Sequence, residues 1–360
     1  MTINGIMFKK LKLENFRNHC KFEIDLDQIT VLVGLNGAGK SNILEAMALL
    51  SFCRSFREDD KKNLINFNSD YARITGDNLE IFLTKTPRLF MQAKENGVIR
   101  KLSNFVGILP TVVFSAETIS IISGSPSDRR RFLDVMISQV DKEYLDALVG
   151  YKKVKQQRNN LLQRICSRQA SEQELAFWDG ELVRFGKLIS KRRKEAVEEI
   201  NIFLPDLYES ISGDSGADLK MVYNQNYEGD LAEVLGQLKY REIACGRSIV
   251  GPHRDDVLFE LNGRNMANFA SRGEIRSAIL AVKMSELKYM EKTKKQSLSL
   301  DDNVIKPMLL LDDIFSEFDQ ERRSHLGELV SQYQTLITST EVEHLSPELL
   351  KKSKIIEIKA

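Results

Sequence analysis

A glycine-rich segment at residues 34–41 constrains the fold of this chain more than any other feature. It is Gly-Leu-Asn-Gly-Ala-Gly-Lys-Ser, preceded by strand formers at 29–33 and followed by helical apolar spacing at 42–47. Glycines let backbone N–H groups surround an anion, and the positive end of the following helix dipole faces the same anion. Strand, glycine turn and helix in this order predict a loop that cradles phosphate groups.

The spacing assigns a role to the polar residues at the end of the loop. Lys40 would reach the β and γ phosphates of a nucleotide, and the Ser41 hydroxyl would ligate Mg²⁺. The flanking strand and helix favour this interpretation over a plain glycine turn, so we predict a nucleoside triphosphate site. The residues assigned to it here are Gly34, Leu35, Asn36, Gly37, Ala38, Gly39, Lys40, Ser41 and Asn42.

Length, charge and cysteine content limit the class of protein. A chain of 360 residues exceeds the length at which one core keeps growing, so we expect two lobes. The net charge of +1 means that any nucleic-acid contact needs a local basic face. Four scattered cysteines argue against a zinc site or a disulfide scaffold. Without a signal-like segment or a bilayer-length apolar run, we expect a cytoplasmic protein with no membrane partner.

An apolar strand that ends in two carboxylates, at residues 307–313, is the predicted partner of the glycine loop. Alone, this stretch would indicate only a core strand followed by a solvated acidic turn. In a chain that also has the glycine loop, a buried strand ending in carboxylates is a typical way to place a metal ligand beside a nucleotide. We assign Asp312 to Mg²⁺, through water, and Asp313 to orienting or deprotonating the attacking water.

A long helical tract interrupts the chain after a helix-start signal at Ser125-Pro126. We predict an inserted helical arm domain at 125–211, with 1–124 and 212–360 forming one ATPase lobe. Residues 151–200 carry twelve Lys or Arg against seven Asp or Glu. This excess is either a DNA-contacting face or a solvated helical surface.

Two local predictions concern secondary structure outside these motifs. Alternating polar and apolar residues at 8–16 predict an edge strand. Residues 291–303 are rich in Lys, Ser and Asp, and we predict a mobile polar loop there.

Two short motifs surround the carboxylate strand. Ser271-Arg272-Gly273-Glu274 opens a helix, and Ser316-Glu317-Phe318-Asp319 follows the strand directly. Ser-x-Gly-Glu by itself predicts only a helix cap. The order is more informative: glycine loop, helical insertion, Ser-x-Gly, carboxylate strand, Ser-x-x-Asp. It resembles the ATPase heads of the ABC and SMC group, which are α/β proteins with a mixed sheet around the phosphate-binding loop.

Further motifs narrow the resemblance. In order and spacing, over nearly the whole chain, they resemble the RecF family of bacterial recombination mediators. The Gly-Pro-His-Arg-Asp-Asp loop and the Arg-Arg-x-Phe-Leu-Asp helix start separate that family from other ABC-type heads. The motifs are Asn15-Phe16-Arg17-Asn18, Phe114-Ser115, the stretch from Ser125 to Asp134, Gly251-Pro252-His253-Arg254-Asp255-Asp256, and the stretch from Leu310 to Asp319.

The resemblance implies an ATP-driven switch with weak, DNA-stimulated ATPase activity. ATP would join two protomers head to tail, with Ser271, Gly273 and Asp319 of one meeting the nucleotide held by the Lys40 loop of the other. Slow hydrolysis would separate them. Such proteins bind duplex DNA near single-strand gaps and, with RecR and RecO, help load RecA onto gapped single-stranded DNA. The resemblance places the chain in DNA replication and homologous-recombination repair, as part of the SOS response to DNA damage.

Several polar residues allow more than one interpretation. Arg17 could approach a phosphate, as similar arginines do in this group, or be a solvated turn residue. Of the three arginines at 129–131, at least one should pair with an acidic neighbour such as Asp134. Residues 253–256 are adjacent, and without properly spaced histidines we interpret them as a structural turn and not a metal cluster.

Sequence does not identify the sensor and switch residues that the resemblance implies. No glutamine is placed as a metal sensor, and Thr338, Ser339 and Thr340 stand where a switch histidine would follow the last strand. We interpret Glu117 and His344 as surface residues.

Two other classes share parts of the pattern. A transporter ATPase subunit would bind a membrane partner, and the long insertion and hydrophilic N-terminus argue against it; membrane flotation would decide. A chromosome-organising SMC head, or the related nuclease-partner head, needs long heptad arms or a zinc hook, and this sequence has neither.

Overall fold

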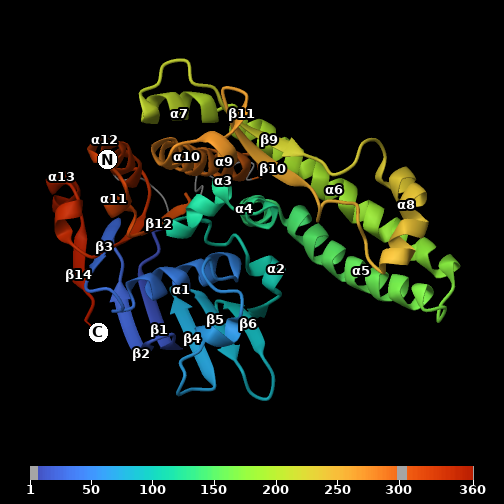
Figure 1. Ribbon diagram of the computed structural model, residues 1–360. Helices are drawn as coiled ribbons and strands as arrows, with labels where there is room; N and C mark the ends of the chain where they lie inside the picture. Colours follow the sequence, from blue (N-terminus) through green and yellow to red (C-terminus); the bar gives the residue numbers. More distant parts are fainter. Residues whose placement is uncertain (1–6, 298–305, 360) are drawn as a thin grey trace.

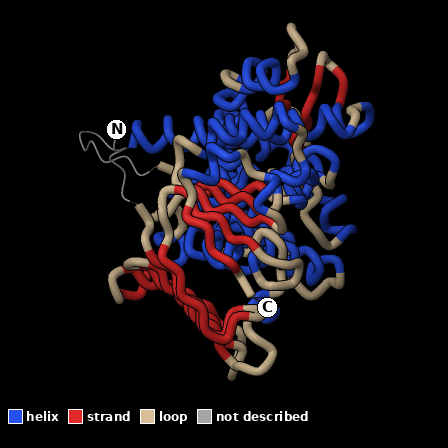
Figure 2. The backbone as a smooth tube through the Cα atoms, turned by 90° about the vertical axis from the view of Figure 1, so that its left-hand side faces the viewer, coloured by secondary structure: helices blue, strands red, loops and turns tan. Residues whose placement is uncertain are grey.

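The computed structural model describes residues 7–297 and 306–359. Strands gather in two main layers, and helices cover the upper layer and extend sideways from it (Figures 1 and 2). Helix α1 lies between the layers, because its apolar residues pack against strands of both. This placement fixes the glycine loop, which precedes α1, at the edge of the sheet that carries the Asp312 strand.

A five-stranded parallel sheet forms the centre of the molecule. Its strands read as nearly continuous apolar runs because both faces are buried. Alternate residues of the strand at 308–312 pack into different hydrophobic cores. Leu309 and Leu311 belong to the core shared with the long helices, whereas Met308 and Leu310 belong to the core that contains α1. In sheet order the strands are β14 (Lys354–Glu357), β3 (Ile29–Val33), β13 (Thr335–Ser339), β12 (Met308–Asp312) and β8 (Thr111–Phe114).

The second layer is an antiparallel sheet, and it corrects the prediction of an edge strand at 8–16. Strand β1 is internal, because β2 and β4 pair with it on opposite sides. The alternation of polar and apolar residues in β1 reflects one solvent-exposed face of the sheet. On this face Lys10 and Lys12 pair with Glu23 at 2.5 and 3.1 Å. The strands, in sheet order, are β2 (His19–Asp25), β1 (Lys10–Phe16), β4 (Tyr71–Gly76), β5 (Leu79–Thr84), β6 (Phe90–Glu95) and β7 (Val98–Arg100).

Helices and a small sheet make up the rest of the chain. The predicted polar loop at 291–303 is wrong for 291–297, which are helical; 298–303 lie outside the described residues. The third sheet is β11 (Arg264–Asn265), β10 (Asp256–Leu261) and β9 (Leu219–Asn224). The helices are α1 (Lys40–Phe52), α2 (Leu102–Phe105), α3 (Ser120–Ser123), α4 (Pro126–Ser138), α5 (Lys142–Cys166), α6 (Leu175–Asn201), α7 (Leu204–Ser212), α8 (Leu231–Cys245), α9 (Met266–Phe269), α10 (Arg272–Ser297), α11 (Ile314–Glu317), α12 (Gln320–Val330) and α13 (Pro347–Lys351), with 3-10 turns η1 (Lys61–Leu64), η2 (Ala116–Ile119), η3 (Glu172–Glu174) and η4 (Val342–His344).

The long helices α5 and α6 form an arm that extends away from the sheets (Figure 1). Helix α8, which follows residue 211, packs on both of them. The three helices are joined by the buried Arg158, whose guanidinium contacts Asp179 and Glu242 at 2.6 Å each. The division of the chain into 1–124 with 212–360, and 125–211, stays a prediction.

The Arg158 contacts predict a large stability effect. Replacing Arg158 with alanine leaves the fully buried Glu242 carboxylate unpaired, so the free energy of unfolding should fall by about 3–5 kcal/mol. Urea denaturation measures this. The matched change Arg184→Ala removes an exposed arm arginine paired with Glu181, and should cost at most about 1 kcal/mol. Equal losses in the two variants would contradict the role given to Arg158.

The 251–256 turn joins the arm to the sheets, as the sequence predicts for a structural turn. Arg193 donates to the carbonyl of Pro252 at 2.7 Å, and Tyr151 contacts His253 at 2.8 Å. Arg129 pairs with Asp256 at 2.8 Å. Within the described residues, no group of three or more His, Cys, Asp or Glu side chains is placed to hold a metal ion.

Two of the three arginines at 129–131 pair with a carboxylate, Arg129 with Asp256 and Arg131 with Asp59, but in the described structure none of them pairs with Asp134, the neighbour given as an example. Asp134 instead accepts hydrogen bonds from Arg193 on α6, at 2.8 Å, and from Tyr144 on α5, at 2.5 Å. Pairing along one helix was the assumption, and packing of three helices at this point supplied closer partners.

His253 should make the protein less stable in acid. Burial, followed by the positive charge of Lys155, lowers the pKa of His253 to about 3. The unfolded chain, with an ordinary pKa of about 6.5, then binds more protons between these values, so stability falls as pH drops through this window. At pH 5 the loss from this group should be about 2 kcal/mol. Urea unfolding at pH 7.5 and pH 5 should show a smaller loss for His253→Gln than for the unchanged protein; equal losses would contradict this account.

Candidate functional site: a phosphate loop beside a carboxylate strand

The glycine loop has the strand–turn–helix form that its sequence predicts. Helix α1 begins at Lys40, directly after Gly39, whose φ is 99°. A side chain at Gly39 would also collide with its support, since a Cβ there would lie 2.6 Å from Asn18 Oδ1 and His19 Nε2. At the other end, a Cβ on Gly34 would meet the carbonyl oxygen of Ile358. Both glycines are therefore required by close approach of other parts of the chain.

The turn between β1 and β2 supports the loop from one side. His19 Nε2 contacts the carbonyl of Gly39 at 3.1 Å, and Asn18 donates to the carbonyl of Ala38 at 3.3 Å. Asn42, predicted to belong to the site, donates to Asn18 Oδ1 at 2.8 Å. Burial lowers the pKa of His19, which favours the neutral ring at this position. Sequence analysis missed this support, although Asn18 stands within one of the quoted motifs.

The Lys40 side chain lies within the loop. Its ammonium donates to the carbonyls of Gly34 and Leu35, at 2.6 and 2.9 Å. Burial lowers the pKa of Lys40, and the nearby charges of Asp313 and Asp312 oppose that change. A cation is thus held beside two carboxylates, at the point where phosphates would be neutralised. Leu35, Asn36 and Gly37 are exposed on the outer side of the loop.

A hydrogen bond joins the glycine loop to the carboxylate strand. Ser41 Oγ donates to Asp312 Oδ1 at 2.7 Å, across 271 residues of chain. Thr338, at the end of the neighbouring strand β13, donates to the same oxygen at 2.7 Å. Because β3, β13 and β12 are adjacent and parallel, their carboxyl ends meet at one sheet edge. The two predicted metal ligands are therefore brought together.

Asp313 occupies a constrained position next to them. Its φ is 52°, in the left-handed region that non-glycine residues seldom adopt, and its N–H donates to Thr338 Oγ1 at 3.0 Å. Burial raises the pKa of Asp313, opposed by the charge of Lys40 and reinforced by that of Asp312. Among the described residues, its Oδ1 is a buried polar atom without a hydrogen-bond partner. A carboxylate with a raised pKa and an oxygen without a hydrogen-bond partner suits a proton acceptor.

His344 corrects the interpretation of this residue as a surface side chain. It is half-buried in η4, beyond β13, and its charge acts on Asp313. Its Nδ1 is buried and, within the part of the chain that the structure describes, has no hydrogen-bond partner. The expected position of a switch histidine is directly after β13, whereas His344 lies further along the chain, in η4. Glu117 is exposed, as expected.

Arg17 lies close to the loop but binds elsewhere in this structure. Its guanidinium makes two 2.8 Å contacts with Glu45, a fully buried carboxylate of α1, and one of 3.0 Å with the carbonyl of Asn63. Of the two interpretations, a solvated turn arginine is wrong. Its contact with a phosphate stays a prediction.

The Ser-x-Gly motif, at the start of α10, and Asp319, at the start of α12, lie close together. Ser271 Oγ accepts from the N–H of Glu274 at 3.2 Å, while Glu274 accepts from the N–H of Ser271 at 2.7 Å. Arg322 connects the two motifs, since it pairs with Asp319 and donates to the carbonyl of Gly273 at 3.4 Å. Among the described residues, no hydrogen bond or ion pair joins Ser271, Gly273 or Asp319 to residues 34–41. These contacts arrange the predicted residues in two groups, one around Lys40 and one around Ser271, which we call the two half-sites.

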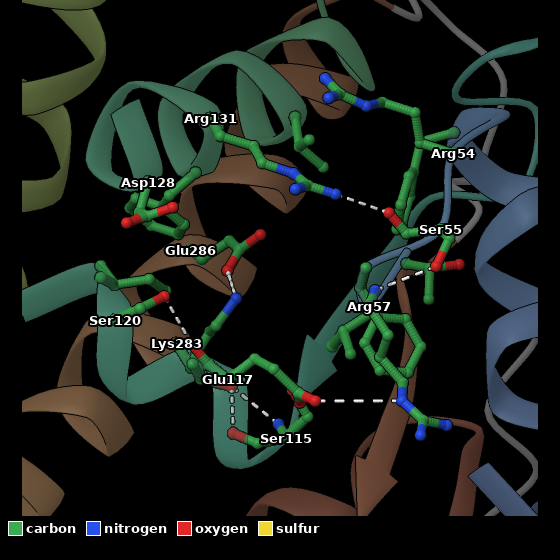
Figure 3. Close-up of a pocket in the computed structure, with 18 residues that line it drawn as sticks. Arg54, Ser55, Arg57, Ser115, Glu117, Ser120, Asp128, Arg131, Lys283 and Glu286 are labelled. Atoms are coloured by element: carbon green, nitrogen blue, oxygen red, sulfur yellow. Dashed lines mark hydrogen bonds and ion pairs between the residues drawn. The ribbon is translucent and has the colours of Figure 1, made fainter. Parts of the chain in front are cut away.

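One hollow in the described structure lies away from the glycine loop. A cavity of about 370 Å³ lies at the opposite end of α1, lined by residues of the 52–57 loop, α4 and α10. Arg131 donates to the carbonyl of Ser55 there at 2.7 Å, and Lys283 pairs with Glu286 at 2.8 Å (Figure 3). Burial raises the pKa of Glu286. These groups are already paired, and the cavity holds none of the predicted nucleotide residues.

The part of the chain that the structure describes contains no helix with both the length and the apolar character needed to span a bilayer.

Comparison with known proteins agrees with the fold. The family model described as the RecF/RecN/SMC N terminal domain matches residues 7–357. DNA replication and repair protein RecF of Agathobacter rectalis is 33% identical over 364 residues, covering 98% of this chain and 97% of the relative. The protein of the same name from Staphylococcus aureus is 30% identical, covering 97% of each chain.

Solved structures give the same assignment. The structure of the recombination mediator protein RecF with ATP, in the RecFOR pathway, superposes with a TM-score of 0.84 and 30% identity, covering 94% of this chain and 93% of that one. The Smc head domain derived from Pyrococcus furiosus, at 17% identity and a TM-score of 0.53, shares the fold alone. The predicted α/β ATPase-head fold is therefore confirmed, with a sheet around the phosphate loop that is parallel and not mixed as predicted. This chain belongs to the RecF family of the RecF/RecN/SMC group.

Proposed function

We propose that this protein is an ATP-driven DNA-binding switch of DNA replication and recombinational repair. In this proposal, ATP binds the Lys40 loop, two copies close around the nucleotides, the closed dimer holds duplex DNA near single-strand gaps, and slow hydrolysis releases it. Support comes from the two half-sites and from the RecF relatives, one of which is described with ATP in the RecFOR pathway.

The donor set fits Mg²⁺. Ser41 Oγ and Asp312 Oδ1, 2.7 Å apart, are hard oxygen donors beside a phosphate cradle, the kind of ligand that this cation prefers. When bound there, Mg²⁺ would supply neutralising charge to the phosphates. The chain would bind the phosphates with its backbone N–H groups and Lys40, as positively charged groups fixed in advance.

Asp313 is the residue we assign to orienting and deprotonating the attacking water. Its raised pKa and unpaired Oδ1 make it a better proton acceptor than an ordinary aspartate. The charge of His344 acts on Asp313, and His344 would therefore respond to the charge at this end of the site.

One observation carries the two-copy arrangement: the structure separates the Lys40 loop from the Ser271–Gly273 and Asp319 half-site. Each half-site also exposes a large apolar side chain. Leu35 in the loop is 79% exposed, and Phe269, two residues before Ser271, is 72% exposed. Exposed apolar groups beside each half-site favour burial against a second copy. A head-to-tail dimer would place two nucleotides between two copies of the chain.

DNA, RecR, RecO and RecA are the partners that we propose, with the cytoplasm as the location. The arm's basic excess at 151–200 is the feature that supports DNA contact. In this proposal, residues 125–211 form the arm domain, and 1–124 with 212–360 form the ATPase lobe.

Duplex DNA binding with and without ATP tests the proposal. Fluorescence anisotropy should show affinity that rises with ATP and falls steeply with salt, because the contacts are to backbone phosphates. Lys40→Met should remove the effect of ATP. If affinity were the same with and without ATP, and in both proteins, the switch would be refuted.

A further inference from the structure

A basic groove at the base of the arm lies outside the nucleotide site. It has a volume of about 590 Å³ and opens between α4 and α5, with the 54–59 loop on one side and the 252–253 turn on another. Helix α5 leaves the body of the protein next to α4 (Figure 1). The groove is lined by six cationic side chains: Arg54, Arg130, Arg131, Lys152, Lys155 and Arg193.

Three carboxylates line the same groove, and each already has a partner. Asp134 binds the buried Arg193 at 2.8 Å. Asp128 accepts from the N–H and the hydroxyl of Ser125, at 2.9 and 2.7 Å, as part of the cap of α4. Asp59 pairs with Arg131 at 3.2 Å and is mostly exposed. The carboxylates therefore neutralise only part of the positive charge.

The uncompensated charge is concentrated on α5. Lys152 and Lys155 are three residues apart, so they share one face of the helix. In the described ranges 7–297 and 306–359, neither lysine has a carboxylate at ion-pair distance. Arg130, across the groove, donates to a backbone carbonyl, that of Asp255, at 2.6 Å. Like charges held together without counterions favour an anionic occupant.

The titration of these groups agrees with the geometry. Burial lowers the pKa of Lys155, and the positive charges of Arg254, Lys152 and Arg130 lower it further. Burial likewise lowers the pKa of Arg54, with Arg131 adding to the effect. The positive charges in the groove therefore repel one another, and a bound anion would reduce this repulsion.

Part of the remaining groove wall is apolar, which narrows the class of anion that fits the groove. A cationic rim beside an apolar wall matches a nucleic-acid strand, with phosphates on the rim and sugars or bases against the wall. The volume lies in the range of small-ligand sites, about 300–1,000 Å³, a size that matches a few nucleotides of one strand. The apolar lining residues are Phe52, Val106, Val135, Leu145, Leu148, Val149 and Ile189.

The basic surface continues beyond the groove. Arg54 and Arg131 also line the neighbouring 370 Å³ cavity, where Arg57 adds a further cation (Figure 3). The cations therefore form a track several side chains long, as a strand with repeated phosphates requires.

We propose that this groove binds the backbone of single-stranded DNA and so fixes a strand against the base of the arm. The inference rests on the proposed DNA-binding function and deepens it by naming the form of DNA and the residues that hold it. The phosphates contact Lys152, Lys155 and Arg130, and the apolar wall covers one side of the sugars and bases.

The test compares two double variants with the same charge change. Lys152→Ala with Lys155→Ala removes the unpaired groove lysines. Lys351→Ala with Lys352→Ala removes two exposed lysines outside the arm that do not line the groove. Binding of a fluorescent twenty-nucleotide oligo(dT), and of a blunt duplex of the same length, is measured by anisotropy across a salt series with ATP present. Nucleotide binding by each variant confirms the fold.

The groove variant should bind oligo(dT) roughly tenfold more weakly, and its salt slope should fall by about 1.4, because each single-strand phosphate contact contributes about 0.7. The control variant and the duplex arm should change less than twofold. An unchanged oligo(dT) affinity in the groove variant, or an equal loss in the control variant, would contradict binding of DNA by the groove. An equal loss for duplex and oligo(dT) overturns the assignment to a single strand. ATP-independent duplex binding by the unchanged protein would instead refute the proposed function.

Discussion

Replacing Asp313 with asparagine should slow ATP turnover by about 10²–10⁴-fold while leaving ATP affinity nearly unchanged. The amide keeps the size of the side chain but cannot accept the proton of the attacking water. Its position also depends on the backbone, because the N–H of Asp313 is fixed by Thr338. Since hydrolysis is the step that opens the proposed dimer, the variant should also dissociate from its second copy more slowly.

Single-turnover phosphate release measures the chemical step, and sedimentation with ATP measures the dimer. The exposed residue Glu348, in the first turn of α13, offers a control, since Glu348→Gln makes the same charge change away from the site. A variant Asp313→Asn that hydrolyses ATP at the unmodified rate would exclude Asp313 as the base.

Replacing Ser271 with arginine should abolish ATP-dependent dimerisation while single chains still bind nucleotide. Ser271 begins α10 at the half-site that would meet the partner's nucleotide, so a long cationic side chain there blocks the approach of the two copies. Loss of the helix cap alone costs about 1 kcal/mol, too little to unfold the protein.

The arm contains a closely matched control for this substitution. Ser171 and Glu174 form the same reciprocal cap as Ser271 and Glu274, with the N–H of Ser171 donating to Glu174 at 2.9 Å. Ser171→Arg should therefore lose a comparable cap and keep the ATP-induced dimer. If sedimentation still shows ATP-induced dimers of Ser271→Arg, the shared nucleotide site is wrong.

Sequence predicted the parts of the site whose signal is local. The loop at 34–41 combines glycine spacing with a strand and a helix, and all three are adjacent in the chain. The carboxylates at 312–313 follow an apolar strand, and parallel pairing of β12, β13 and β3 brings that strand end to the loop. A reader of the sequence could place both because strand ends of a parallel sheet converge.

Side chains that reach the site through packing could not be predicted. His19 and Asn18 meet the loop because β1 and β2 form a hairpin beside it, and nothing in their own neighbourhood indicates a nucleotide. His344 reaches Asp313 only through the turn after β13. Arg17 finds the buried Glu45, a pairing that depends on how α1 packs between the sheets.

Two of the wrong assumptions, the edge strand at 8–16 and the pairing of Asp134, have a similar origin. Alternation at 8–16 reports which face of a strand is wet, and it says nothing about how many neighbours the strand has. Pairing of Asp134 with the arginines of its own helix ignored α6, which brings Arg193 to the same carboxylate. In both cases the contact that decided the structure came from a distant part of the chain.

Mixing two inactive proteins tests the shared nucleotide most directly. Lys40→Ala keeps a normal Ser271 half-site, and Ser271→Ala, which removes the hydroxyl without adding a side chain that blocks the interface, keeps a normal Lys40 loop, so a mixed dimer contains one complete site built from both chains. The account predicts negligible ATP turnover by either protein alone and restored turnover in the mixture, rising with the concentration of each partner. If the mixture stays as inactive as its components while the unmodified protein hydrolyses ATP in the same assay, the nucleotide is not shared between two copies.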